Sequence, residues 1–203
     1  MRMLLVSGVI GRLIKTFSLA FLAPLLLAGL DQEWEVAGGF AASGLICFIL
    51  GRLMSAKYTV PKTLYRAEAM SVVAGTWLFA ALLGALPYLF EGLTFFDSFF
   101  ESMSGITATG ATILTDFDGH GRAFFLWRAM TQWFGGLGVI ALFVVILPRL
   151  GIAGRQLFFA EASGPTDNDL DPQIRRSAER LWILYLGVTL LCALCLTGAG
   201  LSL

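Results

Sequence analysis

The chain has 203 residues, of which 57% are hydrophobic and only 14% are charged. Soluble globular chains carry roughly 25% charged residues, so this composition argues against a water-soluble domain and favours a polytopic membrane protein. The net charge is zero, so no overall field favours nucleic acid or another polyanion as a partner.

Five apolar stretches are long enough to cross the bilayer core as helices, which needs about 20 residues each. They cover approximately residues 10–30, 36–55, 69–90, 124–148 and 180–203. The first stretch continues to Leu30 without a small-residue cleavage site, so we do not expect a cleaved signal peptide. The expected fold class is all-α, with polytopic transmembrane helices.

Basic residues gather in three segments beside these spans. If the spans alternate in direction, 12 of the 14 lysines and arginines fall on one side of the membrane. They are Arg2, Arg12, Lys15, Arg52, Lys57, Lys62, Arg66, Arg149, Arg155, Arg175, Arg176 and Arg180. By the positive-inside rule this side is the cytoplasm, so we expect the N-terminus inside.

The opposite side is acidic. The carboxylates in or beside the outer loops are Asp31, Glu33, Glu35, Glu91, Asp97, Glu101, Asp116 and Asp118, against Arg122 and Arg128. An acidic outer rim raises the local concentration of cations. Loops that are simply polar explain the same pattern equally well.

Residues 91–123 contain an apolar piece that is too short to span a membrane. Thr94 with Asp97 three residues later resembles a capping box, which predicts a helix from about 95 to 104 that Gly105 ends. Ten residues rise roughly 15 Å, about half of the hydrocarbon thickness. We therefore expect a reentrant pore helix followed by a filter loop.

The residues after this helix are Thr107, Ala108, Thr109, Gly110 and Ala111. Non-helical backbone survives at membrane depth only where it is buried in protein or lines a watery path, because unpaired carbonyls are costly in lipid. We expect the carbonyls of 107–111 to form an ion filter, with potassium bound at 107–110. Gly110 can take backbone angles closed to other residues. Because one T-x-T-G is a weak signal, an ordinary outer loop remains the alternative.

Two further patterns lie in the fourth span. The small residues of 135–138 (G-G-L-G) predict close helix packing, with a flexible joint as the alternative. Arg128 near the outer end is expected to pair with Glu101 or Asp116, or to be solvated. No nucleophile–base pair or ligand cluster is found at membrane depth, so we do not expect an enzyme.

The segment 151–179 carries three aspartates before a proline. Asp171 followed by Pro172 predicts a helix start, with the aspartate as N-cap and the proline at the first helical position. The aspartates Asp167, Asp169 and Asp171 lack the glycine and terminal glutamate of an EF-hand loop, so we do not expect a metal site here.

Three motifs together resemble a known family. Residues 99–112 read F-F-E-S-M-S-G-I-T-A-T-G-A-T, 127–138 read W-R-A-M-T-Q-W-F-G-G-L-G, and 147–154 read L-P-R-L-G-I-A-G. This combination resembles the TrkH branch of the Trk/Ktr/HKT potassium transporters, over essentially the whole chain. The resemblance implies potassium transport across the bacterial inner membrane through a pore of four outer-helix, pore-loop, inner-helix units.

The resemblance also implies a domain layout and partners. It places two leading helices in 1–62, the first unit in 63–150, a cytoplasmic linker in 151–179 and a truncated second outer helix in 180–203. The implied partners are potassium, the lipid bilayer, a TrkA-like cytoplasmic nucleotide-binding subunit and a second full-length copy in a homodimer. No cofactor is expected besides the transported ion.

Two departures from the family pattern bear on function. The chain ends at Leu203, before a second pore loop, so we expect a fragment; several copies or another chain completing the pore are the alternatives. Ala108 stands where relatives often carry a third threonine, so one side-chain oxygen is lost. Potassium against sodium selectivity, channel against coupled symport, and a non-conducting role with 95–112 as a packing plug all stay open.

Overall fold

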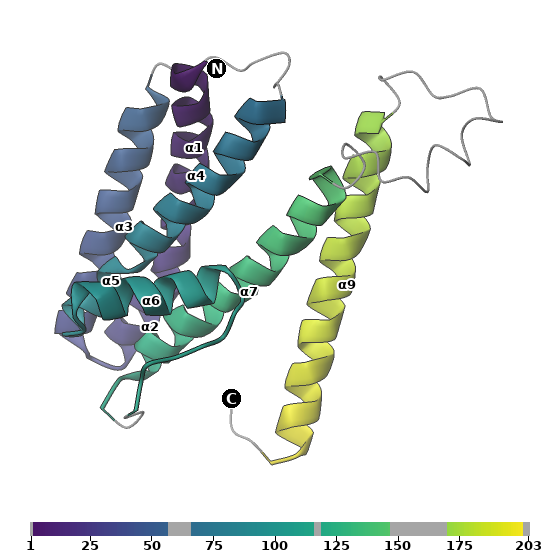
Figure 1. The fold of residues 1–203 in the computed structure, drawn as a ribbon. Helices are drawn as coiled ribbons and strands as arrows, with labels where there is room; N and C mark the ends of the chain where they lie inside the picture. The colour runs from purple at the N-terminus through teal and green to yellow at the C-terminus, as the bar shows by residue number, and fades with distance from the viewer. Residues whose placement is uncertain (1, 57–65, 116–118, 147–169, 201–203) are drawn as a thin grey trace. The chain divides into compact units, whose positions relative to one another are not determined.

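The computed structural model describes residues 2–56, 66–115, 119–146 and 170–200 (Figure 1). Every regular element in these ranges is a helix, which confirms the all-α fold class. The chain forms two compact units, Met1–Gly135 and Gly136–Leu203, and each is described by itself.

Four helical stretches in the described ranges are long and apolar enough to cross a membrane. They are Met3–Leu30, Trp34–Ser55, Ala67–Phe90 and Glu179–Gly198. The remaining predicted span, 124–148, forms helix α7 over Arg122–Ile146, and its last two residues lie outside the described ranges. The predicted domain boundaries stay predictions.

The first span begins at Met3, earlier than predicted, and is made of three pieces. These are α1 (Met3–Phe17), the 3-10 helix η1 (Ser18–Phe21) and α2 (Leu22–Leu30). Pro24 explains the 3-10 turn, because proline has no N–H to donate and its ring crowds the carbonyl four residues earlier. Arg12 does not delay the start of the helix because its side chain is exposed.

Helix α3 (Trp34–Ser55) packs against α1 at very short range. A methyl group added to Gly51 would lie 2.6 Å from the Lys15 nitrogen and 2.7 Å from the Gly11 carbonyl oxygen. Such distances leave room for a hydrogen atom only, so glycine lets the two backbones touch. Small residues at helix crossings are the usual means of close approach in membranes.

The third span is broken into α4 (Arg66–Gly84) and α5 (Leu86–Phe90) near Pro87. The indole N–H of Trp127 on α7 donates a 3.0 Å hydrogen bond to the Gly84 carbonyl oxygen at the break. Trp127 is fully buried, and its ring centroid lies 4.3 Å from that of Phe21. This residue therefore fixes the start of α7 to the first and third spans.

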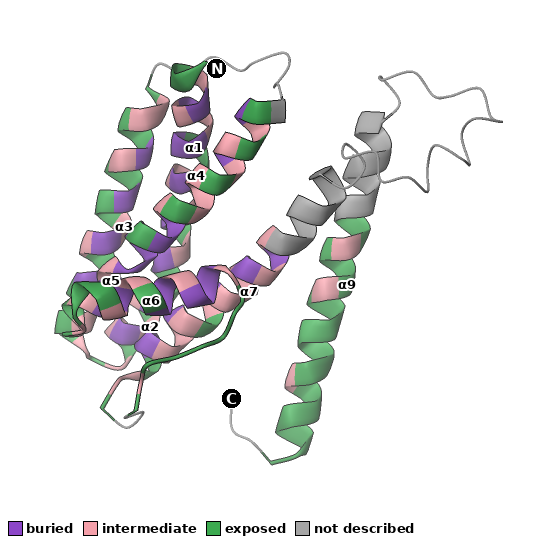
Figure 2. Ribbon diagram, viewed as in Figure 1, coloured by how far each residue is buried: buried purple, intermediate pink, exposed green. Residues whose placement is uncertain are grey.

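In the second unit, α9 spans Leu170–Gly198 and starts before the predicted boundary at 180. The predicted N-cap at Asp171 is wrong, because Leu170 is already helical. Pro172 is the third helical residue and is tolerated there because the first-turn N–H groups of a helix have no intrahelical partner. The apolar part of α9 is exposed (Figure 2).

Gly51→Ala is expected to lower the free energy of unfolding by about 1–3 kcal/mol, because backbone atoms of α1 cannot move aside for the methyl group. Gly38→Ala is the matched control on the same helix, since its methyl group meets nothing within 4 Å and gains roughly 1 kcal/mol of helix propensity. Thermal unfolding in detergent measures both. Equal stability of the two variants would contradict the close α1–α3 contact.

Candidate functional site

The short helix α6 covers Phe95–Ile106 and runs crosswise to α1 and α3 (Figure 1). The N-cap half of the predicted capping box is confirmed: the Thr94 hydroxyl accepts a 3.3 Å bond from the Asp97 N–H. The Asp97 carboxylate accepts a 2.6 Å bond from the same hydroxyl. Twelve residues rise about 18 Å, too little to cross the hydrocarbon layer.

The predicted end of this helix at Gly105 is wrong, because the helix continues to Ile106. Gly105 is buried, and a methyl group there would collide with the Thr131 hydroxyl on α7. A methyl group on Gly135 would collide in turn with the Ile106 carbonyl oxygen. Gly105 therefore serves helix contact rather than helix termination. The close packing predicted for 135–138 is confirmed at Gly135.

The last turn of α6 closes with a Schellman motif. The Ala108 N–H donates to the Gly105 carbonyl at 2.8 Å, and the Thr109 N–H donates to the Ser104 carbonyl at 2.9 Å. This motif needs a left-handed residue, usually glycine; here Ala108 takes the position with φ 55°, and Gly110 follows with φ 76°. Two left-handed residues in three positions turn the chain back along the helix.

The predicted ion ligands 107–111 all lie in this turn. In the described part of the chain no hydrogen bond ends on the carbonyl oxygens of 107–110. The Ala111 carbonyl differs, because it accepts a 2.6 Å bond from the Ser104 hydroxyl and a 3.4 Å bond from Arg128 Nη2. The hydroxyls of Thr107 and Thr109 lie 2.8 Å from each other. The turn thus offers four successive free carbonyls beside one that is occupied.

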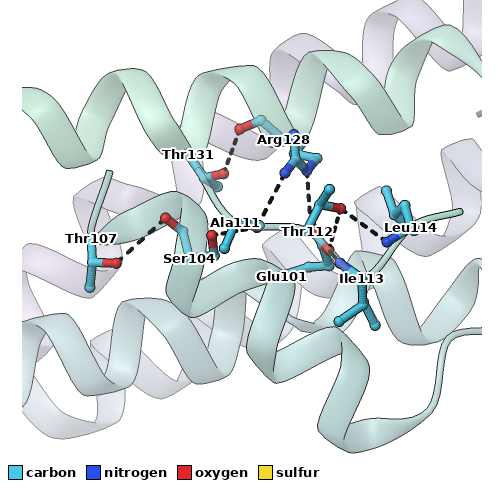
Figure 3. Close-up of polar contacts among 9 residues, drawn as sticks. All are labelled: Glu101, Ser104, Thr107, Ala111, Thr112, Ile113, Leu114, Arg128 and Thr131. Atoms are coloured by element: carbon cyan, nitrogen blue, oxygen red, sulfur yellow. Dashed lines mark hydrogen bonds and ion pairs between the residues drawn. The ribbon is translucent and has the colours of Figure 1, made fainter. Parts of the chain in front are cut away.

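Glu101 on α6 is bonded to the segment 111–113, which follows the turn, and to α7 (Figure 3). Its Oε1 accepts bonds from the Thr112 hydroxyl at 2.6 Å and the Ile113 N–H at 2.8 Å, and its Oε2 accepts a 2.8 Å bond from Arg128 Nε. The predicted pairing of Arg128 with Glu101 is confirmed, whereas Asp116 lies outside the described residues. Glu101 is 0% exposed, so it adds no solvent-facing charge to the predicted acidic rim.

The contacts of Glu101 with Thr112 and Ile113 were not predicted from sequence. The available signal was a charged residue on the otherwise apolar and small-residue run of 99–106, since a buried carboxylate requires partners.

A second polar cluster joins the first outer loop to the start of α7. The Glu91 carboxylate lies 3.7 Å from His120 Nδ1, and Arg122 lies 3.2 Å from Asp31. Burial raises the pKa of Glu91, and the nearby His120 opposes the rise. Two of the carboxylates predicted to face outside, Glu91 and Asp31, therefore each have a basic side chain beside them. Within the described ranges no group of three or more His, Cys, Asp or Glu is placed to hold a metal, and the expectation of no cofactor stays a prediction.

Glu91→Gln is expected to stabilise the protein above the raised pKa of Glu91, where the native state holds a partly buried charge. The native carboxyl binds its proton more readily than the unfolded one, so the gain shrinks as pH falls through the native pKa toward the ordinary 4.5. Unfolding midpoints in detergent between about pH 8 and pH 4 measure the effect. A gain over wild type that stays constant across this range would contradict the burial.

Ala108→Gly is expected to stabilise the turn by about 1 kcal/mol, because glycine takes the left-handed conformation without the steric penalty of a β-carbon. Ala111→Gly is the matched control, because Ala111 does not have a positive φ. Glycine at this position only increases the conformational entropy of the unfolded chain. Thermal unfolding distinguishes them. If Ala108→Gly destabilised as much as Ala111→Gly, the left-handed assignment would be refuted.

Comparisons with known proteins agree with this architecture. The sequence model of TrkH, a cation transport protein, matches residues 38–200. The chain is 37% identical over 202 residues to the Trk system potassium uptake protein TrkH of Escherichia coli K12, covering 97% of this chain and 42% of that protein. It is 30% identical over 196 residues to an uncharacterized cation transporter of Methanocaldococcus jannaschii, covering 96% of this chain and 40% of the relative.

A solved structure also matches. The crystal structure of the potassium transporter TrkH from Vibrio parahaemolyticus superposes with a TM-score of 0.84 at 30% identity, covering 100% of this chain and 41% of that one. The chain thus spans less than half the length of these relatives. The relatives are named for transport, in agreement with the prediction that the chain is not an enzyme. The resemblance inferred from the motifs is confirmed: this chain is an integral membrane protein that belongs to the TrkH family of cation transport proteins.

Proposed function

We propose that the chain supplies part of a potassium uptake pathway across the bacterial inner membrane. The observation that carries the proposal is the run of free carbonyls at 107–110, at the end of a half-length helix. In lipid each unpaired carbonyl is costly. A cation can serve as the partner of these carbonyls, because carbonyl oxygens can replace the ion's hydration shell.

The filter residues in this proposal are Thr107, Ala108, Thr109 and Gly110. The C-terminal end of α6 adds to their attraction for a cation, because a helix carries about half a negative charge there. Ala111, the fifth predicted ligand, has a carbonyl that already accepts two hydrogen bonds. We propose that the Ala111 carbonyl anchors the segment 111–113, which follows the filter.

The orientation follows from the charges. With 12 of 14 basic residues on one side, the positive-inside rule places the N-terminus in the cytoplasm, and α6 then enters from the outer side as a reentrant helix. The proposed layout is two leading helices in 1–62, one pore unit in 63–150, a cytoplasmic linker in 151–179 and a further outer helix in 180–203. One such unit provides one quarter of a four-unit filter, and the remaining pore loops complete it in the assembled transporter.

The proposed partners follow from membership of the family. They are a TrkA-like nucleotide-binding subunit on the cytoplasmic face and a second copy of the full-length protein. The potassium uptake named for the Escherichia coli relative supports potassium as the transported ion.

Gly110→Ser is expected to lower potassium over sodium uptake by roughly fivefold or more, since a backbone change worth about 1 kcal/mol has this effect on an equilibrium. Serine at φ 76° is strained and shifts the filter carbonyls. The measurement is uptake of both ions by cells that depend on the assembled transporter for growth at limiting potassium.

Gly92→Ser is the matched control, because Gly92 also has a positive φ, 91°, and an added methyl group there meets nothing within 4 Å. This variant carries similar backbone strain outside the proposed filter and should keep wild-type selectivity. Unchanged flux and selectivity in Gly110→Ser would refute the filter assignment.

A further inference from the structure

We propose that Glu101 and Arg128 are positioning residues that set the ion selectivity of the filter without touching the ion. This inference rests on the proposed function. The two side chains hold the segment 111–113, which directly follows the four free carbonyls of 107–110.

The burial of Glu101 shows that its role is not to attract ions from solution. Its side chain is 0% exposed, and that of Arg128 is 18% exposed. Both carboxylate oxygens already accept hydrogen bonds, Oε1 from Thr112 and Ile113 and Oε2 from Arg128. Because the guanidinium balances the carboxylate at 2.8 Å, the pair adds no net charge beside the pathway. Glu101 is therefore not an ion ligand.

Glu101 and Arg128 hold the segment 111–113 from two different helices. Glu101 on α6 holds the backbone N–H of Ile113, and Arg128 on α7 reaches the carbonyl of Ala111 at 3.4 Å through Nη2. Ser104 bonds the same carbonyl at 2.6 Å. Figure 3 shows these contacts reaching the segment 111–113 from α6 and α7. One ion pair thus links three separate pieces of chain.

The run 107–110 is held through its own backbone N–H groups and again just beyond its end. On one side the Schellman bonds to Ser104 and Gly105 hold residues 108 and 109. On the other side the Glu101–Arg128 pair holds 111–113. Gly110 lies between these two held pieces, and its N–H makes a long 3.4 Å bond to the Ser104 carbonyl. Selectivity by carbonyls depends on where their oxygens are held, so loosening the second end changes which cation fits.

The test compares Glu101→Gln and Arg128→Gln in the assembled transporter, by uptake of potassium and sodium normalised to the amount of protein in the membrane. We expect each variant to lower the potassium-to-sodium uptake ratio by about fivefold or more. The reason is that each removes charge-assisted hydrogen bonds that hold the segment 111–113. A role in folding alone would lower both fluxes together and leave the ratio at its wild-type value, and that result would overturn the proposal.

Arg122→Gln is the matched control on the same helix. Arg122 also pairs with a carboxylate, Asp31 at 3.2 Å, but its side chain is 72% exposed. Removing this charge should leave the ratio unchanged. A ratio that fell equally in Arg122→Gln and Arg128→Gln would show a general effect of charge near the outer surface and would also overturn the proposal.

Arg128→Lys keeps the buried charge balance and so avoids the folding defect that an unpaired Glu101 would cause. A lysine ammonium lacks the planar fork that lets arginine bond two groups at once, so it cannot hold both Glu101 and Ala111 in the same way. We expect membrane levels near wild type with a ratio between those of wild type and Arg128→Gln. A wild-type ratio in Arg128→Lys and in both glutamine variants would refute the positioning role.

Gly110→Ser measured in parallel separates this proposal from the filter itself. If Gly110→Ser lowers the ratio while Glu101→Gln and Arg128→Gln do not, the filter stands and the positioning role falls. If Gly110→Ser also leaves the ratio unchanged, both proposals fall.

Discussion

A peptide carbonyl at membrane depth must meet a hydrogen-bond donor, a water molecule or a cation, because hydrocarbon offers none of them. The breaks in the described helices follow this constraint. The carbonyl of Gly84, where the third span is interrupted, receives the indole N–H of Trp127. The carbonyls of Ser104 and Gly105 at the end of α6 receive the N–H groups of the turn. Within the described residues no hydrogen bond ends on the carbonyls of the run 107–110, and this is the run that we propose as the ion filter.

Much of this arrangement could be predicted from local sequence. Hydrophobic length predicts the spans, and Thr94 with Asp97 predicts the start of α6, because both signals lie within a few neighbouring residues. The tertiary contacts could not be predicted in this way. From sequence alone Gly105 predicts the end of a helix, whereas in the fold it gives room to Thr131 on α7. An alanine at 108 does not predict a left-handed backbone conformation.

Charge patterning predicts an orientation in the membrane, which stays a prediction, but it is misleading about individual side chains. Glu101 counts as one of the outer carboxylates in the sequence, yet it is buried and paired with Arg128. Arg122 and Asp31 form a second pair. A sequence gives the sign and number of charges in a loop, whereas only the fold decides which of them face water and which satisfy each other.

The contact between Gly135 and the last turn of α6 has a mechanical consequence. Backbone meets backbone there, since a methyl group on Gly135 would collide with the Ile106 carbonyl oxygen. At Gly135 the nearest atoms of α6 are backbone atoms of Gly105 and Ile106, so no side chain separates the two helices at this contact. A tilt of α7 at this level must therefore shift the last turn of α6, and with it the turn 107–110 that carries the proposed filter.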